Sequence, residues 1–343
     1  MASSTKDELL EDSRTDSGID SYRSILKSEE PQRPSGDFSS SGSRDKLSAG
    51  EERLDSAYNS SSITVDSLTE IVKDLNLAPL QQQQEPCPEA SEQDDTLLTT
   101  ITEDGDTLLH LAIIHNEVEI AQELTQIFPK EVLDIQNNLY QTPLHLATYL
   151  NLTSVVKDLV NKGVSLELQD QDGNTALHLA CQHGLVECAS EMTFSRSSLS
   201  TVLKMQNWRG LACLHLAALY RQHQIMKLLM KNGADLNIQE GTSGKTALHI
   251  AVELHDVTSV KLLLPGADMD SAMFNGCTPL HLAVGRQDAA IANLLCQSGA
   301  DTMLRNMEDE TALDLADGND DIMALFPFDD IQISGRSVAN VTF

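Results

Sequence analysis

Six histidines recur at one position of a repeated motif, and a row of imidazole groups could bind metal ions or transfer protons. Each stands in a full or degenerate copy of Thr-Pro-Leu-His-Leu-Ala, and the row is His110, His145, His178, His215, His249 and His281. Such a histidine can instead hydrogen-bond within its own turn, with the threonine of the motif as partner, and brace the next loop. We favour this structural role, because it is by far the commoner use of a histidine repeated in this way.

The remaining chemistry-bearing residues do not assemble into a catalytic or metal-binding pattern. The cysteines are scattered without a Cys-x-x-Cys pair, at Cys87, Cys181, Cys188, Cys213, Cys277 and Cys296. This distribution indicates reduced thiols rather than a disulfide framework or a metal site. The sequence also lacks a Gly-rich phosphate loop and a nucleophile elbow. We therefore predict a protein that is not an enzyme and has no cofactor.

Two serines near the start of the chain predict regulation by phosphorylation. They lie in Asp16-Ser17-Gly18-Ile19-Asp20-Ser21. Phosphorylation of Ser17 and Ser21 would add about −1.5 to −2 charge at each, and both phosphates could pair with arginine clusters on a receptor. Gly18 would allow close backbone approach between them. A tail rich in serine and aspartate produces such pairs by chance, but the whole string is longer than chance comfortably explains.

This string resembles the phosphodegron that a β-propeller F-box subunit of a ubiquitin ligase reads. Lys6 is the only lysine upstream of Ser17, so we predict it as the ubiquitin acceptor, with Lys27 as the rival. A flexible chain would place either lysine within reach of a bound degron.

A short apolar pattern lies further along the same tail. Its residues are Leu68, Ile71, Leu75 and Leu77, which have the spacing of a leucine-rich nuclear export signal. Such a segment would dock spaced anchors into the groove of an export receptor. The alternative is a short helix that folds onto the first structural unit of the chain, and the two interpretations are evenly matched.

The elements that must position these side chains follow from the motif itself. Its fourth positions, ending with Asp314 in place of histidine, are 35, 33, 37, 34, 32 and 33 residues apart. A period of this size indicates a stacked solenoid, in which each unit buries its apolar face against its neighbours. The motif is similar to that of the ankyrin repeat, which implies an all-α array of helix-turn-helix units joined by finger turns. Ankyrin arrays bind other proteins.

Each unit shows the same helix signals. In the second unit, Thr142 is expected to cap the inner helix and Pro143 to occupy its first position. Leu144, Leu146 and Ala147 would give that helix its buried face, and Val155, Val156, Leu159 and Val160 would line the outer helix after a turn at Asn151. A left-handed glycine is expected to end the outer helix at Gly163, Gly233, Gly266 and Gly299. Finger turns are expected at Asp172-Gly173, Ser243-Gly244 and Asn275-Gly276.

Two units depart from the common plan. The third is long, with an insertion near residues 192–203. The seventh has Asp314 in place of histidine and no full second helix, as expected of a polar closing repeat.

Composition divides the chain into three regions. Residues 1–103 are rich in serine, acids, glutamine and proline, so we predict a disordered regulatory region with the phosphodegron and the export-like segment. Residues 104–326 would form six repeats plus an atypical seventh, and residues 327–343 an acidic C-terminal end. No apolar run approaches a membrane span, and the first residues do not resemble a signal peptide, so we expect a cytosolic or nuclear protein.

The charge of the chain favours a basic protein partner. The formal net charge is −29, of which residues 1–103 carry 9 − 22 = −13 and the remainder −16. An acidic surface repels nucleic acid and steers basic protein patches toward it. A partner that itself binds nucleic acid fits this charge well.

Two further features predict where a partner binds. Tyr140, Trp208 and Phe274 lie in or beside the finger turns, where an exposed aromatic ring could be a hot spot or could pack on the neighbouring finger. The acidic residues Glu308, Asp309 and Glu310 lead into the C-terminal end. That end could be a solvated cap, but we favour a patch that mimics a phosphate backbone and competes for the partner's DNA-binding surface.

The repeats behind an Asp-Ser-Gly-Ile-Asp-Ser tail resemble the inhibitor of NF-kappa-B family. Segments 102–107, 111–115, 275–283, 304–311 and 326–335 also look like that family. The resemblance implies a Rel-homology dimer of NF-kappa-B as partner, whose nuclear-localisation segment the first repeats would hold. Here that suggests contacts from Glu103, Asp104, Asp106, Glu117 and Glu119. Ser17 and Ser21 would then be substrates of the inhibitor-of-NF-kappa-B kinase, and Lys6 would be ubiquitinated afterwards.

The implied function is sequestration: the chain would mask the import signal, block DNA and be degraded by the proteasome on command. It would then be cytoplasmic and could shuttle through the nucleus. Two other functions stay open. One is a cytosolic ankyrin scaffold with a phosphodegron and a different partner. The other is a nuclear co-regulator that binds Rel dimers already on DNA, which the degron and the export-like segment argue against.

Overall fold

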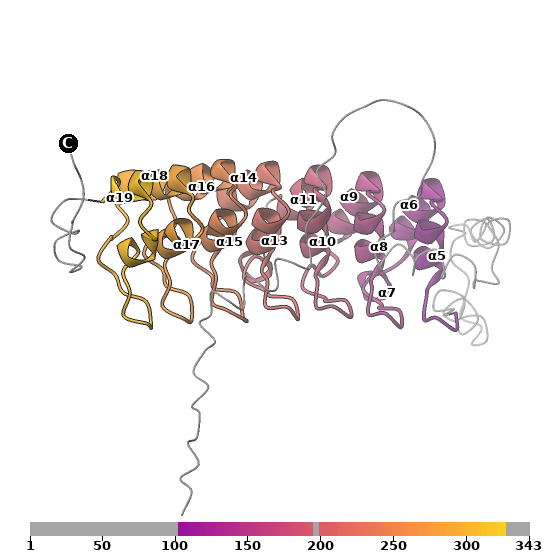
Figure 1. The fold of residues 1–343 in the computed structure, drawn as a ribbon. Coiled ribbons are helices and arrows are strands. Elements are labelled where there is room, and N and C mark those ends of the chain that lie inside the picture. Colours follow the sequence, from indigo (N-terminus) through magenta and orange to yellow (C-terminus); the bar gives the residue numbers. More distant parts are fainter. Residues whose placement is uncertain (1–101, 195–198, 327–343) are drawn as a thin grey trace, which may run out of the picture. The chain divides into compact units, whose positions relative to one another are not determined.

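Pairs of antiparallel helices follow one another along the chain and stack side by side. The computed structural model describes residues 102–194 and 199–326. Figure 1 shows the inner helices in one row, the outer helices in a second row, and the finger loops projecting from one side of the array. The stacking is sequential, since each inner or outer helix packs on its counterpart in the next repeat.

The first three repeats contain the helix pairs α5 (Leu108–Ile114) with α6 (Val118–Ile127), α8 (Pro143–Tyr149) with α9 (Thr153–Lys162), and α10 (Ala176–His183) with α11 (Val186–Thr193). The next three contain α13 (Cys213–Leu219) with α14 (His223–Lys231), α15 (Ala247–Glu253) with α16 (Val257–Leu263), and α17 (Pro279–Gly285) with α18 (Ala289–Ser298). Short helices complete the set: α7 (Lys130–Leu133), α12 (Leu199–Val202), the 3-10 helix η1 (Leu313–Ala316) and α19 (Asp320–Met323). The predicted all-α ankyrin class is confirmed, and none of the described helices is long and apolar enough to cross a membrane.

The inner helices begin where the sequence predicts. Thr142 and Thr175 lie at N-cap positions, and the oxygen of each accepts the backbone N–H of the histidine three residues later. Pro143 occupies the first helical position, where its missing N–H leaves no hydrogen bond unmade. The predicted faces of the second repeat are also confirmed, because its inner residues and its outer row at Val155 and Val156 are all buried.

The helix ends agree with three of the four predicted glycine stops. Gly163, Gly233 and Gly299 have positive φ, whereas Gly266 is not among the positive-φ residues and the prediction for it was wrong. The reason is Pro265. The residue before it, Leu264, still has right-handed helical φ and ψ. A proline ends the helix without a left-handed residue, and Gly266 then donates its N–H to Leu263 O at 3.1 Å.

The two irregular repeats also follow the prediction. The insertion in the third repeat contains α12, whose Leu199 and Val202 are buried and so add to the core. The seventh repeat has only η1 and the four-residue α19 where a full helix pair would stand. Its Asp314 carboxylate takes over the histidine position and accepts from the Thr311 N–H and hydroxyl at 2.9 Å each.

Candidate partner-binding surface

The histidine row braces the array from inside. In the second repeat, His145 Nδ1 accepts from the Thr142 N–H at 3.2 Å and lies 2.8 Å from the Thr142 hydroxyl. Because Nδ1 accepts a backbone N–H, the proton sits on Nε2, which donates to Asn174 O of the next repeat at 3.1 Å. Equivalent bridges reach Gln141, Met205, Ile238, Cys277 and Glu310. The structural role favoured for these histidines is therefore confirmed.

Burial keeps most of these rings neutral. Removal from water lowers the pKa of His110, His145 and His249 to about 4, against a smaller opposing effect of their hydrogen bonds to the next loop. The part of the chain that the structure describes also holds no cluster of three or more His, Cys, Asp or Glu side chains suited to a metal ion.

Most of the described fingers are held in shape by one buried polar side chain at the base, whereas the sixth has Met273 at this position. Asn137 Oδ1 accepts the N–H groups of Leu139 and Gln141 at 3.0 and 2.9 Å. Asp170, Asn207 and Asn306 accept from their own fingers in the same way. The sequence analysis missed this row, although its members recur with the period of the motif. The fingers held in this way are therefore preformed loops with a defined backbone structure.

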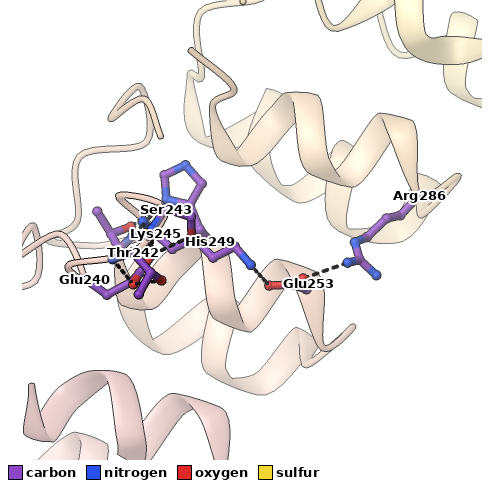
Figure 2. A network of polar contacts seen from close by, with 8 residues as sticks. Glu240, Thr242, Ser243, Lys245, His249, Glu253 and Arg286 are labelled. Atoms are coloured by element: carbon purple, nitrogen blue, oxygen red, sulfur yellow. Dashed lines mark hydrogen bonds and ion pairs between the residues drawn. The ribbon is translucent and has the colours of Figure 1, made fainter. Parts of the chain in front are cut away.

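Glu240 takes this position in the fifth finger (Figure 2). Its carboxylate accepts from the N–H and hydroxyl of Thr242 at 2.7 and 2.5 Å, and from the N–H and hydroxyl of Ser243. Burial alone would raise the pKa of this carboxyl, but the hydrogen bonds from Ser243 and Thr242 outweigh burial and hold the pKa at about 2.

An ion-pair cluster lies close to the same finger. Lys245 pairs with Glu253 at 2.7 Å, and Glu253 also pairs with Arg286 of the sixth repeat at 2.9 Å. Figure 2 shows this chain of contacts running from the fifth finger toward the next helix pair. The cluster therefore ties the fifth and sixth repeats together.

A ladder of glutamine side chains links successive fingers. The Nε2 groups of Gln136, Gln169, Gln206 and Gln239 donate to Gln169 O, Gln206 O, Gln239 O and Ala272 O at 2.9, 3.1, 2.7 and 2.8 Å. Each donor therefore reaches a backbone carbonyl at the base of the next finger. The sequence analysis missed this ladder too, although the glutamines recur with the period of the motif.

The tips of these braced fingers present large apolar side chains to solvent. Tyr140, Trp208 and Phe274 are 60%, 69% and 53% exposed, and Met307, which the sequence analysis overlooked, is 78% exposed. The backbone N–H of each of Trp208, Phe274 and Met307 bonds to the preceding finger at 2.9–3.1 Å. We call Tyr140, Trp208, Phe274 and Met307 the tip row.

Both interpretations of the finger aromatics have support. The Trp208 ring lies so close to the preceding finger that a Cβ at Gly173 would meet ring carbon Cδ2 at 2.7 Å. Likewise, a Cβ at Gly244 would meet Phe274 Cδ1 at 2.6 Å. Each ring thus packs on a glycine of the neighbouring finger and still exposes more than half of its surface.

The acidic residues proposed as contacts at the start of the array separate into two groups. Glu103, Asp104 and Glu119 are exposed, and Glu117 is half-buried at the cap of α6. Asp106 is buried, and its carboxylate accepts from Asn137 Nδ2 at 2.9 Å. Its place in the contact set is a correction, because a carboxylate committed to bracing the second finger cannot reach a partner.

At the other end, Glu308 and Asp309 are exposed in the last finger, beside Met307 of the tip row. Glu310 is half-buried and accepts from Asn306 Nδ2 at 3.2 Å, so it is partly committed to the finger. The tip row thus lies between two exposed acidic groups at opposite ends of the array. The degron residues, Lys6 and the export-like segment lie outside the described residues.

The repeats match a model of the family described as "Ankyrin repeats (3 copies)" in overlapping segments from residue 68 to residue 332. NF-kappa-B inhibitor epsilon of Homo sapiens is 44% identical over 95% of this chain and 69% of its own length. The chain belongs to the inhibitor of NF-kappa-B family. Other similar proteins include NF-kappa-B inhibitor alpha of Homo sapiens, at 38% identity over 61% of this chain and 66% of that protein.

A solved member of this family has the same array. The ankyrin repeat domain of Bcl-3, described as a unique member of the IkappaB protein family, aligns with a TM-score of 0.61 and 37% identity. The alignment covers 65% of this chain and 99% of that domain. The similarity to Bcl-3 thus concerns the repeats, whereas the similarity to the epsilon inhibitor covers nearly the whole chain.

Proposed function

We propose that this chain is an inhibitor of NF-kappa-B that binds a Rel-homology dimer through its fingers, masks the dimer's nuclear-localisation signal and blocks its binding to DNA. The observation that carries the proposal is the 44% identity to NF-kappa-B inhibitor epsilon over 95% of the chain. A similarity of that extent reaches beyond the repeats into the tail.

The surface fits such a partner. The tip row supplies apolar anchors on preformed fingers, and anchors that are rigid before binding lose little entropy when they bind. Glu103 and Asp104 at one end and Glu308 and Asp309 at the other supply negative charge for basic segments of the partner. The acidic end would compete with DNA for the basic surface that normally holds the phosphate backbone.

Regulation would come from the tail. Phosphorylation of Ser17 and Ser21 by the inhibitor-of-NF-kappa-B kinase would create the motif read by a β-propeller F-box subunit, and Lys6 would then accept ubiquitin. Degradation by the proteasome would release the dimer. Until then the complex would be retained in the cytoplasm, with export from the nucleus through the export receptor if residues 68–77 act as an export signal.

The test is to titrate the purified chain into a Rel-homology dimer already bound to labelled DNA, at fixed salt, and to follow release of the DNA. We expect release at near-stoichiometric chain. A double variant, Glu308→Gln with Asp309→Asn, should release less DNA at the same concentration. The difference between this variant and the unaltered chain should shrink as salt rises, because salt screens the lost charges. Asparagine suits Asp309 because the residue has φ of 61° and asparagine tolerates that conformation.

The outcomes separate the alternatives. A stable ternary complex of chain, dimer and DNA would support a nuclear co-regulator instead. No binding at all would leave a regulated ankyrin scaffold with another partner. Phosphorylation-dependent turnover without Rel binding would point to the same scaffold.

A further inference from the structure

The outer helices divide into two sets by charge. In the first three repeats, α6, α9 and α11 carry acidic side chains, at Glu119, Glu123, Asp158, Glu187 and Glu191. In the next three repeats, α14, α16 and α18 carry none. Their lysines, Lys227, Lys231 and Lys261, are all exposed. A chain with a formal net charge of −29 thus has a basic surface on three neighbouring outer helices.

One helical position changes from acid to leucine at the same boundary. The sixth residue of the outer helix is acidic in the first three repeats, at Glu123, Asp158 and Glu191. In the next three repeats it is Leu228, Leu262 and Leu294, and all three side chains are half-buried. Leu262 and Leu294 lie outside the core cluster of the described residues. We call Leu228, Leu262 and Leu294 the outer leucine row.

The second repeat shows where this position lies on the surface. Gln122, the fifth residue of α6, donates from Nε2 to Oδ2 of Asp158, the sixth residue of α9, at 2.6 Å. The fifth residue of one outer helix therefore lies beside the sixth residue of the next. By the same relation we expect Lys227 to lie beside Leu262 and Lys261 beside Leu294. Within the described part of the chain, none of the three lysines belongs to an ion pair.

Acidic residues border this surface. Figure 1 shows the outer helices as the row farthest from the finger loops. On one side α14 packs on α11, where Glu187 is exposed, and on the other α18 packs on α19, where Asp320 and Asp321 are exposed. Further exposed acids follow the three helices where the chain turns toward the fingers, at Asp235, Asp268 and Asp301. An acidic ligand would be repelled beyond the three helices, so these borders would fix its position.

We propose that the outer leucine row, with Lys227, Lys231 and Lys261, binds an acidic amphipathic helix of another protein. The leucines would contact the apolar face of that helix, and the lysines would pair with carboxylates beside it. An anionic membrane or a nucleic acid fits less well, because the rest of this chain would repel it. The finger tips stay free, so the helix and the partner at the tip row would bind to the chain at the same time.

The spacing of the row favours a helix as the ligand. Packed helices lie about 8–10 Å apart, so neighbouring leucines of the row are separated by about that distance. A helix rises about 1.5 Å per residue, so residues seven apart are about 10.5 Å apart and lie on nearly the same face. Apolar residues at i, i+7 and i+14 would therefore meet Leu228, Leu262 and Leu294 in turn. Neighbouring residues on one face of a strand are only about 6.7 Å apart, which does not match.

The test measures binding of a labelled helical peptide to the full chain by fluorescence anisotropy. The peptide has about 18 residues, with leucine at i, i+7 and i+14 and glutamate beside each leucine. Leu262→Asp should weaken its binding about tenfold or more. The substitution is compatible with the fold, because the second repeat has an aspartate, Asp158, at the same position. Thermal unfolding of the variant would confirm that the array stays folded.

Two control variants make the result specific. Ser154→Asp adds the same charge at an exposed position of α9, outside the three helices, and should leave the affinity unchanged. Lys227→Gln with Lys261→Gln should weaken binding severalfold at low salt and less at high salt, because salt screens the lost attraction. Release of DNA from a Rel-homology dimer should be the same for Leu262→Asp and the unaltered chain. That assay therefore separates failure of this proposal from failure of the proposed function.

Several results would overturn the proposal. They are no saturable binding of the peptide, equal affinity of the Leu262→Asp chain, and equal affinity for a peptide of the same composition whose leucines are scattered around the helix. Tighter binding to vesicles of anionic phospholipid than to the peptide would also overturn it, and would assign the surface to a membrane instead.

Discussion

The fourth repeat lacks the threonine that caps the other inner helices, and restoring it should stabilise the protein. Ala212 stands at this position with φ −83° and ψ 167°, nearly the values of Thr175 in the third repeat, −80° and 165°. His215 Nδ1 already accepts from the Ala212 N–H at 3.0 Å, so Ala212→Thr would add only the missing hydroxyl. The position is buried, but threonine fits the same buried site in five other repeats.

The magnitude follows from the cap. A threonine in place of alanine at an N-cap contributes about 0.5–2 kcal/mol, typically about 1. For an array of this size each kcal/mol raises the melting temperature by about 2–4 °C. Thr175→Ala is the reverse change and should cost a similar amount, because it removes an oxygen that accepts the His178 N–H and contacts His178 Nδ1 at 2.7 Å.

Thermal and urea unfolding of the two single variants and the unaltered chain would check this. We expect Ala212→Thr to melt higher and Thr175→Ala lower, with hydrogen exchange changing mainly in the repeat that carries the substitution. A lower melting temperature for Ala212→Thr would mean that the fourth repeat has no room for the side chain. No change in either variant would refute the account of the threonine as a cap.

Three further outcomes follow from the structure. Gln206→Ala removes the bond to Gln239 O and should speed amide exchange in the fifth finger severalfold, corresponding to about 1 kcal/mol, whereas an unchanged finger would show that the ladder does not stabilise it. The free energy of unfolding should fall as the pH is lowered from about 6.5 to 4. In that range the histidines of the unfolded chain bind protons, whereas His110, His145 and His249 of the folded chain, with pKa about 4, do not. A flat profile would contradict the neutrality of these three rings. Trp208→Ala should weaken binding to a Rel-homology dimer about tenfold or more while the array stays folded at the assay temperature. Equal affinity would remove Trp208 from the contact surface.

The repeats were predictable because their helix signals are local. A threonine cap, a proline at the first turn and apolar residues at helical spacing act within one unit, so the sequence analysis placed the second repeat correctly. The prediction for Gly266 was wrong because a proline can also end a helix, and Pro265 directly precedes Gly266.

The surface was harder to predict because it depends on contacts between repeats. Asp106 reads as one more acidic residue near the first finger, and only its bond to Asn137 in the next repeat shows that it is structural. The roles of the glutamine ladder and of the buried side chains at the finger bases cannot be predicted from one repeat alone, because they too depend on neighbouring segments. Their repetition with the period of the motif was the available signal, and a polar residue that recurs with that period is more often a brace than a binding residue.

The positions of two tip aromatics, Trp208 and Phe274, are set by the repeat before their own. Position 173 requires glycine for two reasons. Its φ is 76°, and any Cβ there would meet Trp208 N at 2.6 Å. Phe274 and Gly244 have the same relation. A substitution at either glycine would therefore move an exposed aromatic side chain on the next finger, about one repeat away in sequence. Each of these two exposed rings is therefore positioned by two repeats, so the proposed contact surface depends on contacts between repeats as the stability of the array does.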